Sequence, residues 1–152
     1  MNKSTDILVI GSGIAGLAFA LKVSEADPSC SITILTKTPP SGCNTSQAQG
    51  GIAAVVDEQN DSFARHIEDT MKAGCGVNDR AIVEMVVEEA PARIRDLEKW
   101  GIQFDLDHNG RYDLSKEGGH STHRILHHQD RTGKEILAKL WHPVSAKPRS
   151  EE

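Results

Sequence analysis

The chain has 152 residues, of which 38% are hydrophobic and 26% are charged. This composition is typical of a globular domain and excludes disorder over most of the length. The formal net charge of −5 gives no attraction for nucleic acids or anionic membranes, so neither is expected as a partner. The apolar run near the start is too short for a signal peptide or membrane span, which predicts a cytoplasmic protein.

The first predicted elements form one supersecondary unit. Asp6–Ile10 is a continuous apolar run, typical of a parallel strand buried on both faces. A glycine-rich turn follows, and then 14–25 carries apolar residues on one helical face and ends near Pro28. A second strand is predicted at 31–35. Together they predict an α/β fold with a Rossmann-like βαβ unit and a right-handed crossover.

Residues 36–51 are predicted to form a long loop without regular structure, and such loops usually carry function. Asp61 is expected to cap a helix that ends at Gly74. Asp79 is expected to begin a second helix, which Pro91 must kink or restart. The residues of that helix expected to face the core are Ile82, Val83, Val86, Val87 and Ala90.

The remaining elements are short. Asn109-Gly110 predicts a hairpin turn between 103–106 and 112–114. Residues 115–130 are predicted as a loop, and 131–140 as one or two helical turns. Trp141-His142-Pro143 is expected to break the helical pattern.

The sequence GSGIAG at Gly11–Gly16 fits the GxGxxG pattern, placed between a predicted strand and a predicted helix. Gly11 permits a tight turn, Gly13 allows the backbone to approach a pyrophosphate, and Gly16 lets helix and strand pack closely. The N–H groups and dipole at the helix N-terminus would then hold phosphates. This combination predicts dinucleotide binding.

The acidic residue that binds ribose in many such sites is absent, because Thr36 and Lys37 follow the second strand. Lys37 could pair with the 2′-phosphate of NADP, which makes an NADP-dependent reductase one alternative, or it could be a surface lysine. The polar segment 44–54 could border a flavin, since its amides and hydroxyls donate hydrogen bonds and its glycines admit a flat ring. It could equally be a surface loop.

Several motifs in register carry a resemblance to a known family. GSGIAG, the Thr-Lys pair, NTSQAQGGIAA at 44–54, EGGHS at 117–121 and the segment 124–133 occur in the order and spacing of L-aspartate oxidases. These enzymes belong to the fumarate reductase and succinate dehydrogenase flavoprotein family. The resemblance implies FAD-dependent oxidation of L-aspartate to iminoaspartate in quinolinate and NAD biosynthesis, with oxygen or fumarate as electron acceptor. It also implies an association with quinolinate synthase.

The resemblance assigns roles to individual residues. Asn44 stands where membrane-bound relatives carry a histidine linked to FAD, which implies non-covalent FAD. Glu117 stands where dicarboxylate-specific relatives carry an apolar residue, and would recognise the substrate ammonium group. From the residues alone, Glu117 could instead be an exposed charge beside Lys116. The residues implied to contact FAD are Gly11, Ser12, Gly13, Ile14, Ala15, Gly16, Lys37, Asn44, Thr45, Ser46, Gln47, Ala48, Gln49, Gly50 and Gly51.

No metal site is expected. His123 and His127 would share a helical face, but no cysteine or carboxylate nearby completes a ligand set. The three cysteines form no CxxC pair and are expected to be reduced thiols.

Family members are several times longer, and the resemblance ends at about Leu140. We therefore expect residues 1–140 to form the N-terminal part of the FAD-binding domain. Residues 141–152 are expected to be a disordered tail unrelated to the family, produced by a frameshift or premature stop. The chain by itself is expected to be inactive, and a second alternative is a non-catalytic fragment that at most associates with other chains.

Overall fold

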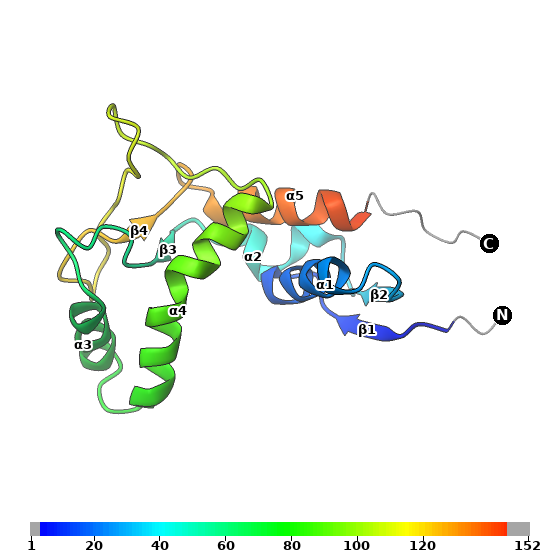
Figure 1. The fold of residues 1–152 in the computed structure, drawn as a ribbon, viewed down its shortest axis with the longest axis horizontal. Helices are drawn as coiled ribbons and strands as arrows, with labels where there is room; N and C mark the ends of the chain where they lie inside the picture. The colour runs from blue at the N-terminus through cyan, green and yellow to red at the C-terminus, as the bar shows by residue number, and fades with distance from the viewer. Residues whose placement is uncertain (1–3, 146–152) are drawn as a thin grey trace. The chain divides into compact units, whose positions relative to one another are not determined.

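The computed structural model describes residues 4–145, without the side chains of Pro40 and Ser145. The described residues form two compact units, one comprising residues 4–49 and 131–145 and the other residues 50–130. Their helices and strands are labelled in Figure 1. Among the described residues, no helix is long and apolar enough to cross a membrane.

The first unit is built on the predicted βαβ motif. Strand β1 (Ile7–Ile10) pairs in parallel with β2 (Ile32–Leu35), and helix α1 (Ile14–Ala26) connects them (Figure 1). The helix packs its apolar face inward, where Leu17, Ala20 and Leu21 are buried. The α/β fold class and the order strand, glycine turn, helix, strand are confirmed.

Strand β1 is less buried than the sequence predicted. Val9 is buried, but Leu8 is 53% exposed and Ile10 is 81% exposed. Side chains alternate between the two faces of a strand, and Val9 faces α1, where its Cγ1 lies 3.0 Å from the position of a Cβ on Gly16. The prediction of burial on both faces is wrong for this unit, because the face opposite Val9 remains open.

Two helices and a helical turn complete the first unit. The turn η1 (Pro40–Gly42) and helix α2 (Asn44–Gln47) lie within the segment that was predicted as an irregular loop, so that prediction is wrong in part. Ser46 stabilises this region, because its hydroxyl donates to the carbonyls of Ser41 and Cys43 over 2.6 and 2.7 Å. Such polar turns leave no apolar periodicity in the sequence.

Helix α5 (Thr132–Ser145) packs against α1 and α2 and buries Ile136, Leu137 and Leu140. It is longer than predicted, and the expected break at Trp141-His142-Pro143 is wrong. Pro143 lies in the last turn, where its missing N–H removes a single helical hydrogen bond. Residues 146–152 of the predicted tail lie outside the described residues.

The second unit contains a two-stranded antiparallel sheet. Strand β3 (Ile52–Ala53) pairs with β4 (Ile125–Leu126), although 115–130 was predicted as loop throughout. Two-residue strands show no alternation that a sequence pattern can detect. The close pairing also explains Gly51, because a Cβ at that position would overlap the Leu126 carbonyl and the Ile125 side chain.

Helices α3 (Phe63–Ala73) and α4 (Arg80–Lys99) pack against each other in the second unit. Asp79 caps α4 as predicted, accepting hydrogen bonds from the N–H groups of Ala81 and Ile82. The prediction that Asp61 caps α3 is wrong. Ser62 is the cap, because its hydroxyl accepts from the Arg65 N–H, while the buried Asp61 side chain turns to another partner.

The apolar stripe of α4 is only partly in the core. Val87 is 3% exposed, but Ile82 is 53% and Val86 is 57% exposed, so the prediction that all five stripe residues face the core is wrong. The stripe is wider than the area of α4 that α3 and the neighbouring segments cover. The helix runs through Pro91, so the chain does not restart there.

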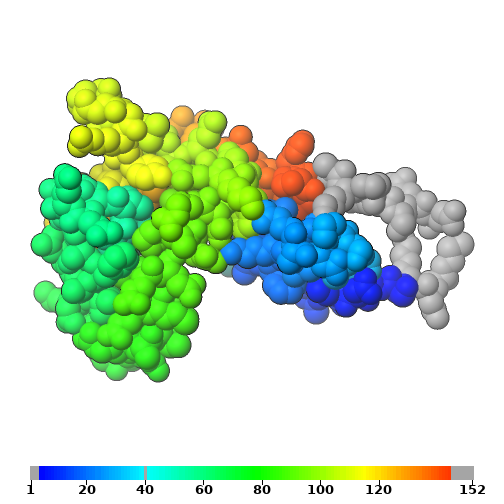
Figure 2. All heavy atoms as spheres, in the orientation of Figure 1, coloured from blue at the N-terminus to red at the C-terminus, as the bar shows by residue number. Residues whose placement is uncertain are grey.

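The predicted hairpin turn at Asn109-Gly110 is confirmed. Leu106 and Tyr112 form an antiparallel bridge, the Asp107 N–H donates to the Arg111 carbonyl over 2.7 Å, and Gly110 has a φ of 76°. The flanking segments make an isolated bridge rather than continuous strands. This hairpin projects from its unit, as the yellow-green segment of Figures 1 and 2 shows.

Candidate functional site

The glycine turn of the first unit has the geometry that its sequence predicted. Gly11 adopts a φ of 107°, and its N–H donates to the Leu35 carbonyl over 2.8 Å, which joins the turn to β2. A Cβ at Gly16 would lie 2.6 Å from the Gly11 carbonyl oxygen, so glycine is required for α1 to approach β1 this closely. The structural roles predicted for Gly11 and Gly16 are thus present.

The N-terminus of α1 is open except for one side chain. Its cap residue is Gly13, which offers no side-chain hydrogen bond, while the Ile14 N–H donates to the Thr45 hydroxyl over 3.0 Å. A Cβ at Gly13 would have the Thr45 hydroxyl as its nearest neighbour, at 3.4 Å. Thr45, predicted as an FAD contact, therefore also ties the 44–49 segment to the glycine turn.

The 44–49 segment is held on a second side by α5. The Gly133 N–H donates to the Ala48 carbonyl over 3.0 Å, and a Cβ at Gly133 would overlap the Thr45 carbonyl. The sequence indicated Gly133 only as part of the segment that carries the family resemblance. Its close packing explains why glycine is needed there. The segment is fixed between the N-termini of α1 and α5.

The other predicted cofactor residues of the first unit differ in exposure. Ser12 is buried, and its hydroxyl donates to the Thr36 hydroxyl over 3.1 Å, so its side chain serves the turn. The exposed residues are Ala15, Lys37, Asn44, Gln47, Ala48 and Gln49. Gly11 is not blocked either, because a Cβ at its position would have no heavy atom within 4 Å. The glycine turn is therefore accessible.

These features fit the pyrophosphate of a dinucleotide. A phosphate needs N–H donors without competing side chains, and α1 begins at a glycine with no side-chain cap. The accessible Gly11 and Gly13 allow close approach of the backbone to the phosphates. The first unit therefore has the main-chain arrangement of a nucleotide-binding turn.

In the second unit, Glu117 lies beside Gly50. The Glu117 Oε1 atom is 3.0 Å from the position that a Cβ on Gly50 would occupy, so a larger residue would displace the carboxylate. Glu117 begins a turn in which the His120 N–H donates to the Glu117 carbonyl over 3.2 Å, and Gly119 adopts a φ of 87°. The structure brings together two residues that are 67 positions apart (117 minus 50), for which the resemblance implied different roles, FAD contact for Gly50 and substrate recognition for Glu117.

A buried arginine lies seven residues beyond Glu117 and has no exposed surface. The Arg124 guanidinium donates to both oxygens of Asp61, from Nε over 2.7 Å and from Nη2 over 2.8 Å. Its Nη1 donates to Asp69 over 2.6 Å and contacts His120 Nδ1 at 3.0 Å. Asp61 thus pairs with an arginine rather than capping α3.

The pKa values in this cluster follow from burial and charge. Burial raises the pKa of Asp69, but hydrogen bonds from Ser121 and Arg124 outweigh it and lower the pKa to about 2. For Asp61, burial is likewise outweighed by Arg124, and its pKa is also lowered. Both carboxylates remain ionised at neutral pH and pair with the positive charge of Arg124.

His66 lies next to this cluster. It is 5% exposed, and its Nδ1 has no hydrogen-bond partner among the described residues. Burial first, and then the positive charge of Arg124 and the proximity of His120, lower the pKa of His66 to about 4. His66 is therefore neutral at physiological pH.

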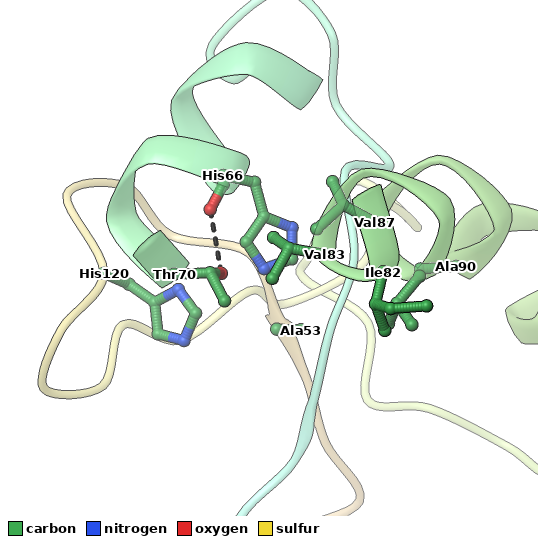
Figure 3. Close-up of a pocket in the computed structure, with 9 residues that line it drawn as sticks. Ala53, His66, Thr70, Ile82, Val83, Val87, Ala90 and His120 are labelled. Atoms are coloured by element: carbon green, nitrogen blue, oxygen red, sulfur yellow. Dashed lines mark hydrogen bonds between the residues drawn. The ribbon is translucent and has the colours of Figure 1, made fainter. Parts of the chain in front are cut away.

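The His66 and His120 rings lie 5.6 Å apart at one end of a pocket of about 360 Å³ (Figure 3). Ala53 and Thr70 also line it, and the remaining lining residues are apolar and come from α4: Ile82, Val83, Val86, Val87 and Ala90. Figure 3 also shows the hydrogen bond within α3 that the Thr70 hydroxyl donates to the His66 carbonyl over 2.9 Å. All five residues of the α4 stripe, buried and exposed, thus form one wall of the pocket.

Sequence reasoning missed the roles of Arg124, Asp61, Asp69 and His66. These residues meet across 55 to 63 positions of chain, as in the Arg124 bonds to Asp69 and Asp61. No short motif links them, so no local signal could have found the cluster. Within residues 4–145, no group of three or more histidine, cysteine or acidic residues is arranged to hold a metal ion.

Comparison with known proteins identifies the family. The pattern of the FAD binding domain family matches residues 6–150. The L-aspartate oxidase of Yersinia pestis is 45% identical over 148 residues, which cover 95% of this chain and 27% of that protein. The chloroplastic L-aspartate oxidase of Arabidopsis thaliana is 42% identical over 146 residues, covering 96% of this chain and 22% of the relative. The chain thus spans about a quarter of the length of these relatives.

Solved structures agree with the sequence comparison. E. coli quinol fumarate reductase matches with a TM-score of 0.87 at 30% identity, covering 95% of this chain and 24% of that one. Mycobacterium smegmatis Sdh1 in complex with UQ1 matches with a TM-score of 0.82 at 36% identity, covering 91% of this chain and 23% of that one. FAD, rather than the NADP considered above, is the cofactor of the matched family. The chain belongs to the FAD binding domain family, in the flavoprotein group that includes L-aspartate oxidases and fumarate reductases.

Proposed function

We propose that this chain is the FAD-binding part of an L-aspartate oxidase, an enzyme that oxidises L-aspartate to iminoaspartate. The observation that carries the proposal is the position of Glu117 against Gly50 in a chain that is 45% identical to an L-aspartate oxidase. In this proposal oxygen or fumarate accepts the electrons, the product enters quinolinate and NAD biosynthesis in the cytoplasm, and quinolinate synthase is a partner. The chain alone is inactive.

The first unit holds the cofactor. The N–H groups at the start of α1 bind the pyrophosphate, and Gly11 and Gly13 admit it without Cβ interference. In this proposal Lys37, which is exposed after β2, interacts with FAD rather than with a 2′-phosphate. Asn44 lacks a nucleophilic imidazole, so FAD is held without a covalent bond.

The second unit recognises the substrate. When bound, FAD supplies the oxidising chemistry by accepting a hydride from the substrate Cα. The Glu117 carboxylate pairs with the ammonium group that distinguishes aspartate from succinate, because a charge leaving water needs an opposite charge. Gly50 leaves room for that carboxylate, since any larger residue would meet Oε1.

The cofactor assignment is tested in a chimera in which residues 6–140 replace the matching segment of the Yersinia pestis relative. Acid precipitation should leave all the flavin in the supernatant, as expected for non-covalent FAD. Gly13→Val should abolish flavin binding, because a branched side chain would fill the phosphate approach. Ala26→Val at the exposed end of α1 is the control. Normal flavin content in the Gly13 variant would refute the proposed turn.

The substrate assignment is tested with Glu117→Gln in the same chimera. Loss of a charge-assisted hydrogen bond of roughly 1.5–3 kcal/mol predicts a ten- to hundredfold decrease in kcat/KM for aspartate. Fumarate reduction should change little, because fumarate has no ammonium group. Lys116→Gln, the exposed neighbour, is the matched control. Equal losses for both substrates would remove Glu117 from the substrate site.

A further inference from the structure

One carboxylate oxygen anchors the end of the turn that carries Glu117. Asp69 Oδ2 accepts three hydrogen bonds, from the Ser121 N–H over 2.8 Å, the Ser121 hydroxyl over 2.7 Å and Arg124 Nη1 over 2.6 Å. Asp69 belongs to α3, so the turn is attached to a helix rather than to its own neighbours. A side chain with this many charge-assisted bonds defines the position of the backbone it holds.

Arg124 also determines the state of His120. A guanidinium has only donors, so at 3.0 Å from Arg124 Nη1 the His120 Nδ1 atom must accept the hydrogen bond. An imidazole that accepts at Nδ1 is neutral and carries its proton on Nε2. The cluster therefore selects one of the two neutral tautomers of His120.

Arg124 itself is fixed from a second direction. Both oxygens of Asp61 bind it, and the Asp61 and Arg124 side chains are 2% and 0% exposed. Its own carbonyl accepts the Ala54 N–H over 3.0 Å, beside strand β3. Arg124 consequently cannot move without breaking contacts with α3, with Asp61 in the segment that precedes α3, and with the β3 region.

We propose that Arg124 and Asp69 are positioning residues for the turn Glu117–His120, which place the Glu117 carboxylate at Gly50 and hold His120 as the tautomer protonated on Nε2. The inference rests on the proposed function in that this turn carries the residue that recognises aspartate. Neither Arg124 nor Asp69 touches the substrate in this arrangement. They act through Ser121 and His120.

The tautomer is measured directly on the chain itself, without FAD or substrate. Long-range ¹H–¹⁵N spectra at neutral pH distinguish a histidine protonated on Nε2 from one protonated on Nδ1. The expected spectrum of His120 is that of the Nε2–H form. A His120 that is protonated on Nδ1, or on both nitrogens, would overturn the proposal without any variant.

The anchoring is measured with Asp69→Ala, which leaves Arg124 paired with Asp61. Exchange of the Ser121 amide proton should accelerate about tenfold or more, and the His120 signals should shift toward a mixture of tautomers. The Ala54 amide, bonded to the Arg124 carbonyl, should keep its protection and show that the unit remains folded. Glu68→Ala is the matched control, since Glu68 is the preceding residue on α3 and pairs with the exposed Arg80.

The consequence for substrate recognition is measured in the chimera. Asp69→Ala should raise the KM for aspartate on the order of tenfold, with the fumarate KM and kcat close to the parent values. Equal changes for both substrates, or the same change in Glu68→Ala, would overturn the positioning role. If Glu117→Gln leaves the activity of the parent chimera unchanged, the proposed function fails. The tautomer and exchange measurements on the chain still test whether Arg124 and Asp69 position the turn.

Discussion

The two units of this chain build their candidate sites from different materials. In the first, the glycine turn is shaped by the main chain, through the φ of Gly11 and the contact between Gly16 and the Gly11 carbonyl. In the second, the turn at Glu117 is held by charged side chains, with Arg124 between Asp61 and Asp69. A site of the first kind is damaged when atoms are added, and a site of the second kind when a charge is removed.

Removing the buried charge should give the largest effect. Arg124→Met leaves Asp61 and Asp69 ionised without their partner, and removing one member of a buried ion pair costs about 3–5 kcal/mol of unfolding free energy. Urea unfolding followed at the Ala54 amide measures the change in the second unit. Arg80→Met, which breaks an exposed pair with Glu68, should cost less than about 1 kcal/mol. Equal losses would show that burial of the cluster does not matter.

The second effect is a pH dependence centred on His66. Its pKa is about 4 in the folded chain and 6.5 when unperturbed, so the unfolded chain binds the proton more readily. Stability of the second unit should therefore fall as pH decreases from 6.5 to about 4, by about 3 kcal/mol, and then level off for this group. Arg124 and His120 oppose the proton, whereas Asp61 and Asp69 favour it.

His66→Gln is the variant that isolates this slope. Between pH 6.5 and 4 its unfolding free energy should change much less than that of the parent chain. The stability that Asp61 and Asp69 contribute through their lowered pKa values is lost only at more acidic pH, because their unperturbed pKa is 3.8. A variant with the same slope as the parent would assign the pH dependence to other groups.

Adding one methyl group tests the first unit. Gly16→Ala places a Cβ 2.6 Å from the Gly11 carbonyl, and such overpacking costs about 1–3 kcal/mol. The amide of Gly11, bonded to Leu35, should exchange faster. Gly118→Ala provides the control, because its Cβ would meet no heavy atom within 4 Å and its φ is not positive. A neutral Gly16 variant would mean that α1 can move away from β1 freely.

The smallest effects should come from the helix caps of the second unit. Ser62→Ala and Asp79→Ala should each cost about 1 kcal/mol, since each removes the side chain that binds the first N–H groups of its helix. Glu58→Ala, in the exposed loop before α3, should stay within about 0.5 kcal/mol. A Ser62 variant with no effect would return the capping role to Asp61.

The same contrast explains which parts the sequence predicted. The βαβ unit, the Asp79 cap and the Asn109-Gly110 turn depend on residues close together in sequence, where glycine, aspartate and apolar periodicity have direct backbone consequences. The Arg124 cluster and the pairing of β3 with β4 depend on residues far apart in sequence, and neither has a periodicity of its own. Asp61 shows how a long-range partner can override a local pattern. Its position before a helix favoured a cap, but a buried arginine is a stronger partner than an N–H group.

The proximity of Glu117 and Gly50 was not predicted, although the resemblance implied a role for each residue. Nothing in the local pattern of either residue indicates that they meet, because a carboxylate beside a lysine is typical of an exposed loop. The resemblance supplied the two roles, and the structure supplied the proximity. The tests on Glu117 therefore also test whether the roles of residues can be transferred by position from relatives that are 42–45% identical.

Pro91 divides helix α4 into two parts that differ in how readily they unfold. Proline has no N–H, so the carbonyl of Val87 lacks its usual donor in the middle of the helix. The part before it exposes Ile82 and Val86 and buries Val87, while the part after it buries Ile94 and Leu97. Since fewer buried contacts hold the first part, it can open while the second part stays folded. The wall of the pocket beside His66 would then rearrange without global unfolding.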